Sequence, residues 1–238
     1  MSAVIWHDLE NGGYAEDREL WRALADRTGD PVLDVGAGTG RVTLDLARRG
    51  HTVTALDHDA ALIAELNRRG AGLPVDTVVA DARQFELDRR YALCIVPMQT
   101  IQLLGGHEGR LGFLRAAQGH LVPGGVLAIA LSDALDLYDE AEGLLMPLPD
   151  IAEHDGVVYS SQPMAVRADD DGFVLERRRE IVTPQGERTT LGDRIRLDEL
   201  TPDELESEGR SIGLRPAGRE TVPETRDYVG STVVLLSV

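Results

Sequence analysis

Residues 32–41, "VLDVGAGTGR", join an apolar run to a helical pattern through three glycines at alternate positions. Glycines in such a turn allow a ligand to lie directly against the backbone. The spacing is G-x-G-x-G, with Gly36, Gly38 and Gly40, whereas the dinucleotide fingerprint G-x-G-x-x-G requires a glycine where Arg41 stands. The loop therefore predicts a ligand at a strand-to-helix turn and leaves its identity open.

Two carboxylates follow the glycine loop at places where they can bind an adenosine group. Asp57 closes the predicted strand 52–57, and from there its carboxylate can accept two hydrogen bonds from a ribose diol. Asp57 could instead only cap the next helix, although Asp59 is already placed for that role. Asp81 ends the next predicted strand, where it can accept from an adenine amino group. A dinucleotide and S-adenosylmethionine both contain adenosine, and they predict different chemistry.

The elements that position these residues alternate between apolar strands and amphipathic helices. Such alternation predicts parallel strands joined by right-handed crossovers, and hence a doubly wound α/β sheet. The predicted strands are 31–35, 52–57, 75–81, 91–97 and 124–131, and the predicted helices are 39–49, 59–70 and 107–121.

The pattern changes after Ser132. Three strands are predicted at 156–167, 172–182 and 189–197, joined by turns as an antiparallel meander. A helix then begins at Thr201, followed by two closing strands.

This change of pattern divides the chain into a main domain and an insertion. Residues 1–135 and 200–238 are predicted to form the ligand-binding domain, with 1–30 as an N-terminal cap segment. Residues 136–199 are predicted to be an antiparallel β insertion, acting as a substrate cap or a dimer interface.

Composition narrows the classes of partner. The formal net charge is −17, and such a surface repels nucleic-acid phosphates and anionic lipid. The first residues show neither a basic region nor a long apolar run, and no later run reaches the length of a membrane helix, so we expect a cytoplasmic protein. The only cysteine, Cys94, lies in an apolar run and is expected in the core. No metal site is predicted.

The order of the glycine loop, Asp57, Asp81 and the Pro-Gly-Gly turn in "HLVPGGVLAIAL" resembles that of class I S-adenosylmethionine-dependent methyltransferases. The resemblance covers roughly residues 30–135 by motif and 200–238 by pattern. It implies a seven-stranded, mostly parallel Rossmann-like sheet with the last strand antiparallel.

The resemblance also implies a set of cofactor-binding residues. Asp34, Gly36, Ala37 and Gly38 would line the methionine end of S-adenosyl-L-methionine, and Asp57 would hold its ribose. His58 would lie beside adenine, and Asp81, Ala82 and the adjoining Arg83 would bind the base.

A narrower resemblance is carried by "YALCIVPMQTIQLL" and "LVPGGVL". These stretches are similar to a bacterial subgroup of small-molecule methyltransferases that includes amino-sugar N-methyltransferases and carries a β insertion after the fifth strand. The similarity implies that Pro97, Met98 and Gln102 lie next to the cofactor. Tyr14 matches an early tyrosine near the active site of the subgroup, and it could equally pack against the sheet.

Candidate catalytic residues are few because methyl transfer mainly requires alignment and exclusion of water. His107 lies on the ligand side of the predicted sheet and is a weak candidate for a base, as is Tyr14. His51 and His120 precede strands and are expected to be structural, while His7 and His154 lie in segments that could close over the site. Asp133 and Asp136 could bind an amine or simply be solvated.

The sequence therefore predicts methyl transfer from S-adenosylmethionine to N or O of a small-molecule metabolite. "VPMQ" stands where enzymes that methylate the amino groups of bases carry D/N-P-P-Y/F, which disfavours that subclass. One alternative is a protein of the same fold that binds S-adenosylmethionine or S-adenosylhomocysteine without transferring methyl. The other is a nicotinamide-dependent oxidoreductase, which Arg41 disfavours.

Overall fold

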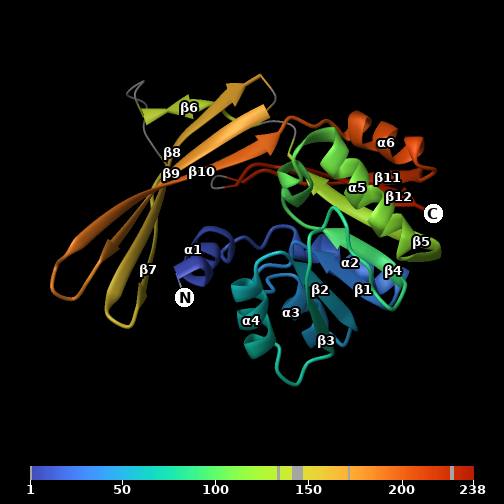
Figure 1. Cartoon of the computed structure of the whole chain (residues 1–238), viewed down its shortest axis with the longest axis horizontal. Coiled ribbons are helices and arrows are strands. Elements are labelled where there is room, and N and C mark those ends of the chain that lie inside the picture. Colours follow the sequence, from blue (N-terminus) through green and yellow to red (C-terminus); the bar gives the residue numbers. More distant parts are fainter. Residues whose placement is uncertain (1, 133–134, 141–146, 171, 226–227) are drawn as a thin grey trace.

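The computed structural model describes residues 2–132, 135–140, 147–170, 172–225 and 228–238. The described chain consists of an α/β body and a separate antiparallel sheet that projects from it (Figure 1). The elements of the body before the projecting sheet are α1 (Ser2–Asn11), α2 (Arg18–Thr28), β1 (Val32–Val35), α3 (Thr43–Arg48), β2 (Val53–Asp57), α4 (Ala60–Arg69), β3 (Val75–Val79), β4 (Tyr91–Val96), the 3₁₀ helix η1 (Thr100–Leu103), α5 (Gly106–Gly119) and β5 (Leu121–Leu131).

The projecting sheet and the end of the chain follow. The projecting sheet contains β6 (Tyr138–Asp139), β7 (Asp150–His154), β8 (Val157–Asp169), β9 (Gly172–Val182) and β10 (Arg188–Asp198). The body is completed by α6 (Pro202–Ser211), β11 (Arg215–Val222) and β12 (Ser231–Ser237). None of the described helices is long and apolar enough to cross a membrane.

The body contains a seven-stranded sheet with the order β11-β12-β5-β4-β1-β2-β3. Strands β3, β2, β1, β4 and β5 pair in parallel, while β12 runs antiparallel to both of its neighbours. The predicted doubly wound, mostly parallel sheet is confirmed. The chain steps outward from β1 to β3 and then returns to the other side of β1 with β4. Ligands of open α/β sheets bind at such a reversal, outside the carboxyl ends of the strands.

Helices cover both faces of this sheet because successive side chains of each strand point to opposite sides. Leu33 and Val35 of β1 pack with side chains of α5 and α6 in one core cluster. Val32 of β1 packs with Trp21 and Leu24 of α2 on the other side. The central strands β1 and β2 are therefore buried on both faces, as their continuous apolar runs in the sequence predicted, whereas the edge strand β3 is partly exposed.

The predicted helix signals are confirmed at two positions. Asp59 caps α4 by accepting hydrogen bonds from the backbone N–H groups of Ala61 and Leu62. Thr201 and Glu204 form the expected capping box at the start of α6, where the Thr201 N–H donates to Glu204 Oε2 at 2.8 Å. These caps satisfy donors that a helix start otherwise leaves unpaired.

Some boundaries differ from the expected ones. The helix predicted for residues 39–49 begins only at Thr43, because residues 39–42 are used in the turn of the glycine loop. Strand β5 starts earlier than expected, at Leu121. Strands β6 and β7 were not predicted, and Asp133 lies outside the described residues.

The projecting sheet follows the predicted meander. Its order is β10-β9-β8-β6, with β7 also pairing with β8, and the pairings are antiparallel. We use the word insertion for residues 138–198. Figure 1 shows the insertion beside the body, with α1 between the two.

Helix α1 joins the body to the insertion through charged side chains at its end. On the insertion side, Glu10 accepts two hydrogen bonds from Arg179, both at 2.7 Å, and one from the Ser161 hydroxyl at 2.6 Å. On the body side, Asp8 accepts from Arg69 Nη1 at 3.0 Å and from the Thr39 hydroxyl at 2.6 Å. Each carboxylate therefore fixes one side of the helix.

The Glu10 carboxylate is largely removed from solvent, with a side chain that is 7 % exposed. Burial alone would raise the pKa of Glu10, but hydrogen bonds from Arg179 and Ser161 and the charge of Arg177 hold it below its ordinary value. A carboxyl group with a lowered pKa stabilises the folded state above its unfolded pKa, and the contribution is lost as pH falls through the folded value.

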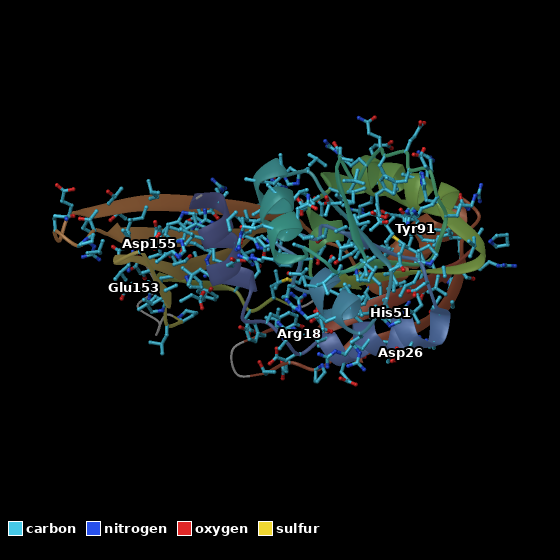
Figure 2. The ribbon with its side chains drawn as sticks, turned by 90° about the horizontal axis from the view of Figure 1, so that it is seen from below. Arg18, Asp26, His51, Tyr91, Glu153 and Asp155 are labelled. Carbon is cyan, nitrogen blue, oxygen red and sulfur yellow. The ribbon has the colours of Figure 1, made fainter. Side chains whose placement is uncertain are left out.

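Glu10→Ala is expected to lower the free energy of unfolding by roughly 2 kcal/mol, because it leaves two half-buried arginines without their shared carboxylate. Glu153→Ala is the matched control, since Glu153 is exposed at the outer end of the insertion (Figure 2). Urea denaturation measures both variants. Equal stability of the two variants at neutral pH would contradict the role assigned to Glu10.

Candidate functional site

A cavity of about 540 Å³ lies at the carboxyl ends of β1, β2 and β4, at the chain reversal described above. Helix α1 and strands β9 and β10 of the insertion form its other walls. The lining residues are His7, Glu10, Asn11, Asp34, Gly36, Ala37, Arg41, Val42, Leu56, Asp57, His58, Leu62, Ala80, Asp81, Ala82, Arg83, Pro97, Met98, Gln99, Thr100, Leu103, Leu104, Leu175, Arg177, Ile195 and Leu197.

The glycine loop forms the floor of this cavity and needs glycine at two positions. Gly36 and Gly38 have φ values of +74° and +56°, a region that side chains other than glycine rarely adopt. A Cβ atom at Gly36 would collide with Thr100, and one at Gly38 would collide with the His7 ring. The glycines therefore let η1 and α1 approach the loop from two sides.

Asp34 is the most deeply buried carboxylate of the site, with 1 % of its surface exposed. Its Oδ2 accepts a hydrogen bond from the Thr43 hydroxyl at 2.6 Å, while its Oδ1 has no partner among the described residues. Burial raises the pKa of Asp34 to about 6, and the hydrogen bond from Thr43 only partly opposes the shift. A buried acceptor without a donor is costly, so Asp34 is suited to a cationic or N–H-bearing ligand.

Asp57 is also buried, with 7 % of its surface exposed, and it organises the loop. Its Oδ2 accepts from the Gly38 N–H at 2.8 Å, and its Oδ1 accepts from the Asp59 N–H at 2.9 Å. A carboxylate oxygen can accept more than one hydrogen bond, so each oxygen retains capacity for a ligand. The exposed His58 lies beside it, with Nδ1 3.4 Å from Asp57 Oδ1.

Asp81 follows β3 and is paired with Arg83. The Arg83 guanidinium donates to Asp81 Oδ2 at 2.6 Å, and the Arg83 backbone N–H donates to Oδ1 at 2.9 Å. Hydrogen bonds from the Arg83 side chain and backbone lower the pKa of Asp81. Ala80 and Ala82 flank the pair, so an apolar surface adjoins the carboxylate at this end of the cavity.

The structure brings most of the predicted site residues into one place. Ten of them line the cavity, namely Asp34, Gly36, Ala37, Asp57, His58, Asp81, Ala82, Arg83, Pro97 and Met98. The four others, Tyr14, Gly38, Gln102 and His107, do not line it. Gly38 is separated from the cavity by the His7 ring that packs on it.

Tyr14 lies in the core between α2 and the sheet. Its ring contacts the Tyr228 ring, with centroids 4.9 Å apart, and the Arg41 guanidinium lies 5.0 Å from the Tyr14 centroid. Burial, together with the nearby Asp17, raises the pKa of Tyr14 to about 12. These contacts match the second of the two roles that the sequence left open for Tyr14, namely packing against the sheet.

Gln102 and His107 have structural partners outside the cavity. The Gln102 side chain bonds to the backbone of Ser132 and Asp198, the two points where the chain leaves and re-enters the body. His107 Nδ1 lies 2.9 Å from Glu208, in a second depression that shares no residue with the cavity. Asp136 is exposed and does not line the cavity either.

Of the four remaining histidines, three lie outside the cavity and one lines it. His51 bonds to Asp26 and Asp30 on the body, far from the insertion, and Figure 2 shows His51 beside Asp26. His120 Nε2 accepts a hydrogen bond from the Leu87 N–H. His120 directly precedes β5 and so lies at the amino end of that strand, whereas the cavity lies at the carboxyl ends of the strands. His154 lies at the end of β7, outside the cavity, whereas His7 lines it.

The sequence did not identify the walls supplied by distant segments. Glu10 and Asn11 come from α1, while Leu175, Arg177, Ile195 and Leu197 come from the insertion. The alternation of side chains along β9 and β10 was a usable signal, because Leu175 and Arg177 share a face of β9 and Ile195 pairs with Leu175. Which face meets the body depends on tertiary packing.

The chemistry of the cavity fits S-adenosylmethionine and disfavours a pyrophosphate. Asp34 lies in β1, Asp57 ends β2 and Asp81 follows β3, and these three strands are neighbours in the sheet. All three lining arginines are engaged by carboxylates: Arg41 with Asp17 at 2.5 Å, Arg83 with Asp81, and Arg177 with Asp150 at 2.7 Å. The row can receive an ammonium group, ribose hydroxyls and an adenine amino group.

Comparison with known proteins agrees with this geometry. Residues 32–125 match the family model described as a methyltransferase domain. A probable cobalt-precorrin-6B C(15)-methyltransferase of Methanothermobacter thermautotrophicus is 37 % identical over 105 residues, which cover 42 % of this chain and 51 % of that protein. The cypemycin N-terminal methyltransferase of a Streptomyces species is 30 % identical over 130 residues, covering 53 % of this chain and 52 % of that protein. The matches thus span about half the length of these curated relatives.

Solved structures resemble the whole described fold. The S-adenosylmethionine-bound amino pentose methyltransferase CalS10 of Micromonospora echinaspora has a TM-score of 0.72 at 19 % identity, covering 98 % of this chain and 96 % of the other. The sugar N-methyltransferase KedS8 of a Streptoalloteichus species has a TM-score of 0.73 at 20 % identity, covering 98 % and 92 %. Residues 32–125 are therefore similar to a methyltransferase domain, and the chain has the Rossmann-like fold of these solved S-adenosylmethionine-dependent methyltransferases.

Proposed function

We propose that this protein transfers a methyl group from S-adenosylmethionine to a nitrogen or oxygen of a small molecule. The row of Asp34, Asp57 and Asp81 carries the proposal, above all the unpaired Oδ1 of Asp34. A sulfonium methyl is already an activated group, so the protein has to hold the acceptor in line and exclude water. A general base is needed only where the acceptor atom is protonated at the working pH.

Different lining residues would bind different parts of the cofactor along the cavity. Asp34 would hold the ammonium group of the cofactor, Asp57 the ribose, and Asp81 with Ala82 the base. Pro97 and Met98 follow β4 at the chain reversal and would face the methyl group. Met98 has a φ of +58°, a strained conformation for a residue with a side chain, and such strain is often found at functional sites.

The insertion would contact the acceptor. Leu175, Ile195 and Leu197 give the cavity an apolar wall, and Arg177 lies next to them on β9. The two solved structures described above are named as amino pentose and sugar N-methyltransferases, which makes the amine of an amino sugar the first acceptor class to test. The boundaries given to the insertion, 136–199, and its role as a substrate cap belong to the same proposal.

A homodimer formed through the insertion is a second role that the sequence suggested. Leu148, Ile151 and Leu191 support it, because each of these apolar side chains is at least 44 % exposed. A cytoplasmic location likewise stays a prediction from the sequence.

Asp57→Ala is expected to weaken binding of S-adenosylhomocysteine by roughly 2–4 kcal/mol, because hydrogen bonds to a charged group are each worth about 1.5–3 kcal/mol. Titration calorimetry measures the change. Asp76→Asn serves as the control, since Asp76 lies on β3 outside the cavity and pairs with exposed Arg89. Unchanged affinity in Asp57→Ala would remove Asp57 from the site.

Asp34→Asn is expected to stabilise the ligand-free protein and to weaken cofactor binding. The raised pKa means that, between about pH 4 and about pH 6, the folded protein retains a proton that the unfolded chain has lost. The contribution of Asp34 to stability therefore falls as pH rises, and a neutral amide removes this cost. Thermal melting should show a higher midpoint for the variant at about pH 8 and a smaller difference at about pH 5.

The raised pKa of Asp34 also predicts how cofactor binding depends on pH. Wild-type affinity for S-adenosylmethionine should rise as pH increases through about 6, because the cation prefers the ionised Asp34 carboxylate. Asp34→Asn should lose most of this dependence. A variant with wild-type affinity and the wild-type pH profile would contradict the assignment.

Methyl transfer itself is tested by incubating the protein with S-adenosylmethionine and a set of amino sugars and small phenols. Formation of S-adenosylhomocysteine that depends on an acceptor is the expected result. NADH is the control ligand. Saturable NADH binding without binding of S-adenosylmethionine would instead support an oxidoreductase.

A further inference from the structure

His7 is the one lining residue that α1 places directly on the glycine loop. Its Nε2 and Cε1 atoms occupy the space where Gly38 would otherwise carry a side chain. Its side chain is 24 % exposed and lines the cavity. The ring therefore stands between the loop and any ligand that lies across it.

A chain of hydrogen bonds determines which nitrogen of His7 carries the proton. The Thr39 hydroxyl donates to Asp8 Oδ1 at 2.6 Å, and a carboxylate can only accept. The Thr39 oxygen therefore has to accept from His7 Nδ1, which lies 3.3 Å away. Asp8 is held in turn by Arg69. This arrangement places the proton on Nδ1 and leaves Nε2 as an acceptor.

The free nitrogen is left without a donor. Nε2 of His7 has no hydrogen-bond partner within the described ranges of the chain. Burial lowers the pKa of His7 below its ordinary value, although the neighbouring Asp8 and Asp57 act in the opposite direction. The imidazole is consequently neutral at pH 7, and its Nε2 carries a lone pair that no described residue uses.

Asp57 presents acceptors at the same glycine. The Gly38 N–H donates to Asp57 Oδ2, and the His7 ring covers Gly38 from the other side. Both Asp57 oxygens already take one backbone N–H each. Three acceptor atoms, the two Asp57 oxygens and His7 Nε2, thus lie near Gly38. A vicinal diol has two O–H donors, one for Asp57 and one for His7.

We propose that His7 Nε2 accepts a hydrogen bond from one ribose hydroxyl of the adenosyl cofactor, beside Asp57. The inference rests on the proposed function, because that function supplies the diol. It makes α1 a part of the cofactor site. It also means that one helix touches the cofactor through His7 and the insertion through Glu10.

The test measures binding rather than turnover. His7→Phe keeps a flat ring without a nitrogen, and His7→Gln keeps an acceptor near the position of Nε2. Titration calorimetry is performed on the full chain with S-adenosylhomocysteine and with its 2′-deoxy and 3′-deoxy analogues. Thermal melting of the ligand-free variants shows whether each is folded, and His7→Leu replaces His7→Phe if the larger ring is not tolerated.

His7→Phe is expected to bind S-adenosylhomocysteine roughly three- to tenfold more weakly than the wild type, the effect of one neutral hydrogen bond. One of the two deoxy analogues, the one that lacks the hydroxyl bound by His7, should bind wild type and His7→Phe equally. His7→Gln should recover most of the lost affinity. If the His7 ring only packed against the loop, its replacement would change the affinity for all three ligands by the same factor.

An equal loss for all three ligands in His7→Phe, or the absence of any loss, would overturn the assignment of His7 while leaving the proposed function intact. If the wild-type protein binds none of the three ligands, the proposed function fails and the assignment fails with it. The wild-type titration therefore separates the two cases.

Discussion

The buried Asp34 carboxylate needs a compensating ligand, and it lies in a row with Asp57 and Asp81 at the carboxyl edge of adjacent strands. Asp34 and Asp57 are 1 % and 7 % exposed, in a chain whose formal net charge is −17. A buried charge is tolerated when it is paired, and Asp34 has one oxygen without any partner among the described residues. The same edge holds the glycine loop, so the backbone can approach the ligand closely while the carboxylates receive its donors. A cationic adenosyl cofactor meets all of these conditions, whereas a pyrophosphate would add two negative charges to them.

The second organising feature is that the cavity belongs to both parts of the molecule. The sheet supplies the cofactor-facing floor, and the insertion supplies an apolar wall with Arg177. Helix α1 contacts both parts through Asp8 and Glu10, and the Gln102 amide bonds to the backbone of Ser132, before the insertion, and of Asp198, at its end. An acceptor in this cavity would therefore contact the insertion while the cofactor lies on the body.

Local chemistry explains how much could be predicted from the sequence. Asp59 and the Thr201–Glu204 capping box could be predicted because caps depend on neighbours within a few residues. Asp57 and Asp81 could be predicted because parallel strands bring their carboxyl ends to one edge. Tyr14, Gln102 and His107 lie in the right region of the sequence, but their partners come from segments that only the folded chain brings near. Tyr14 meets Tyr228, Gln102 meets Asp198 and His107 meets Glu208. Arg177 was missed for the same reason, and His7 was predicted only to lie in a segment that could close over the site.

The most direct measurement of the central claim is a crystal structure of the protein with S-adenosylhomocysteine. We expect the amino group of that ligand to lie within about 3 Å of the unpaired Asp34 oxygen, and we expect its adenosine to lie across the ends of β2 and β3. A ligand-bound structure in which Asp34 Oδ1 is still without a donor, or in which the adenosine lies away from Asp57, would contradict it.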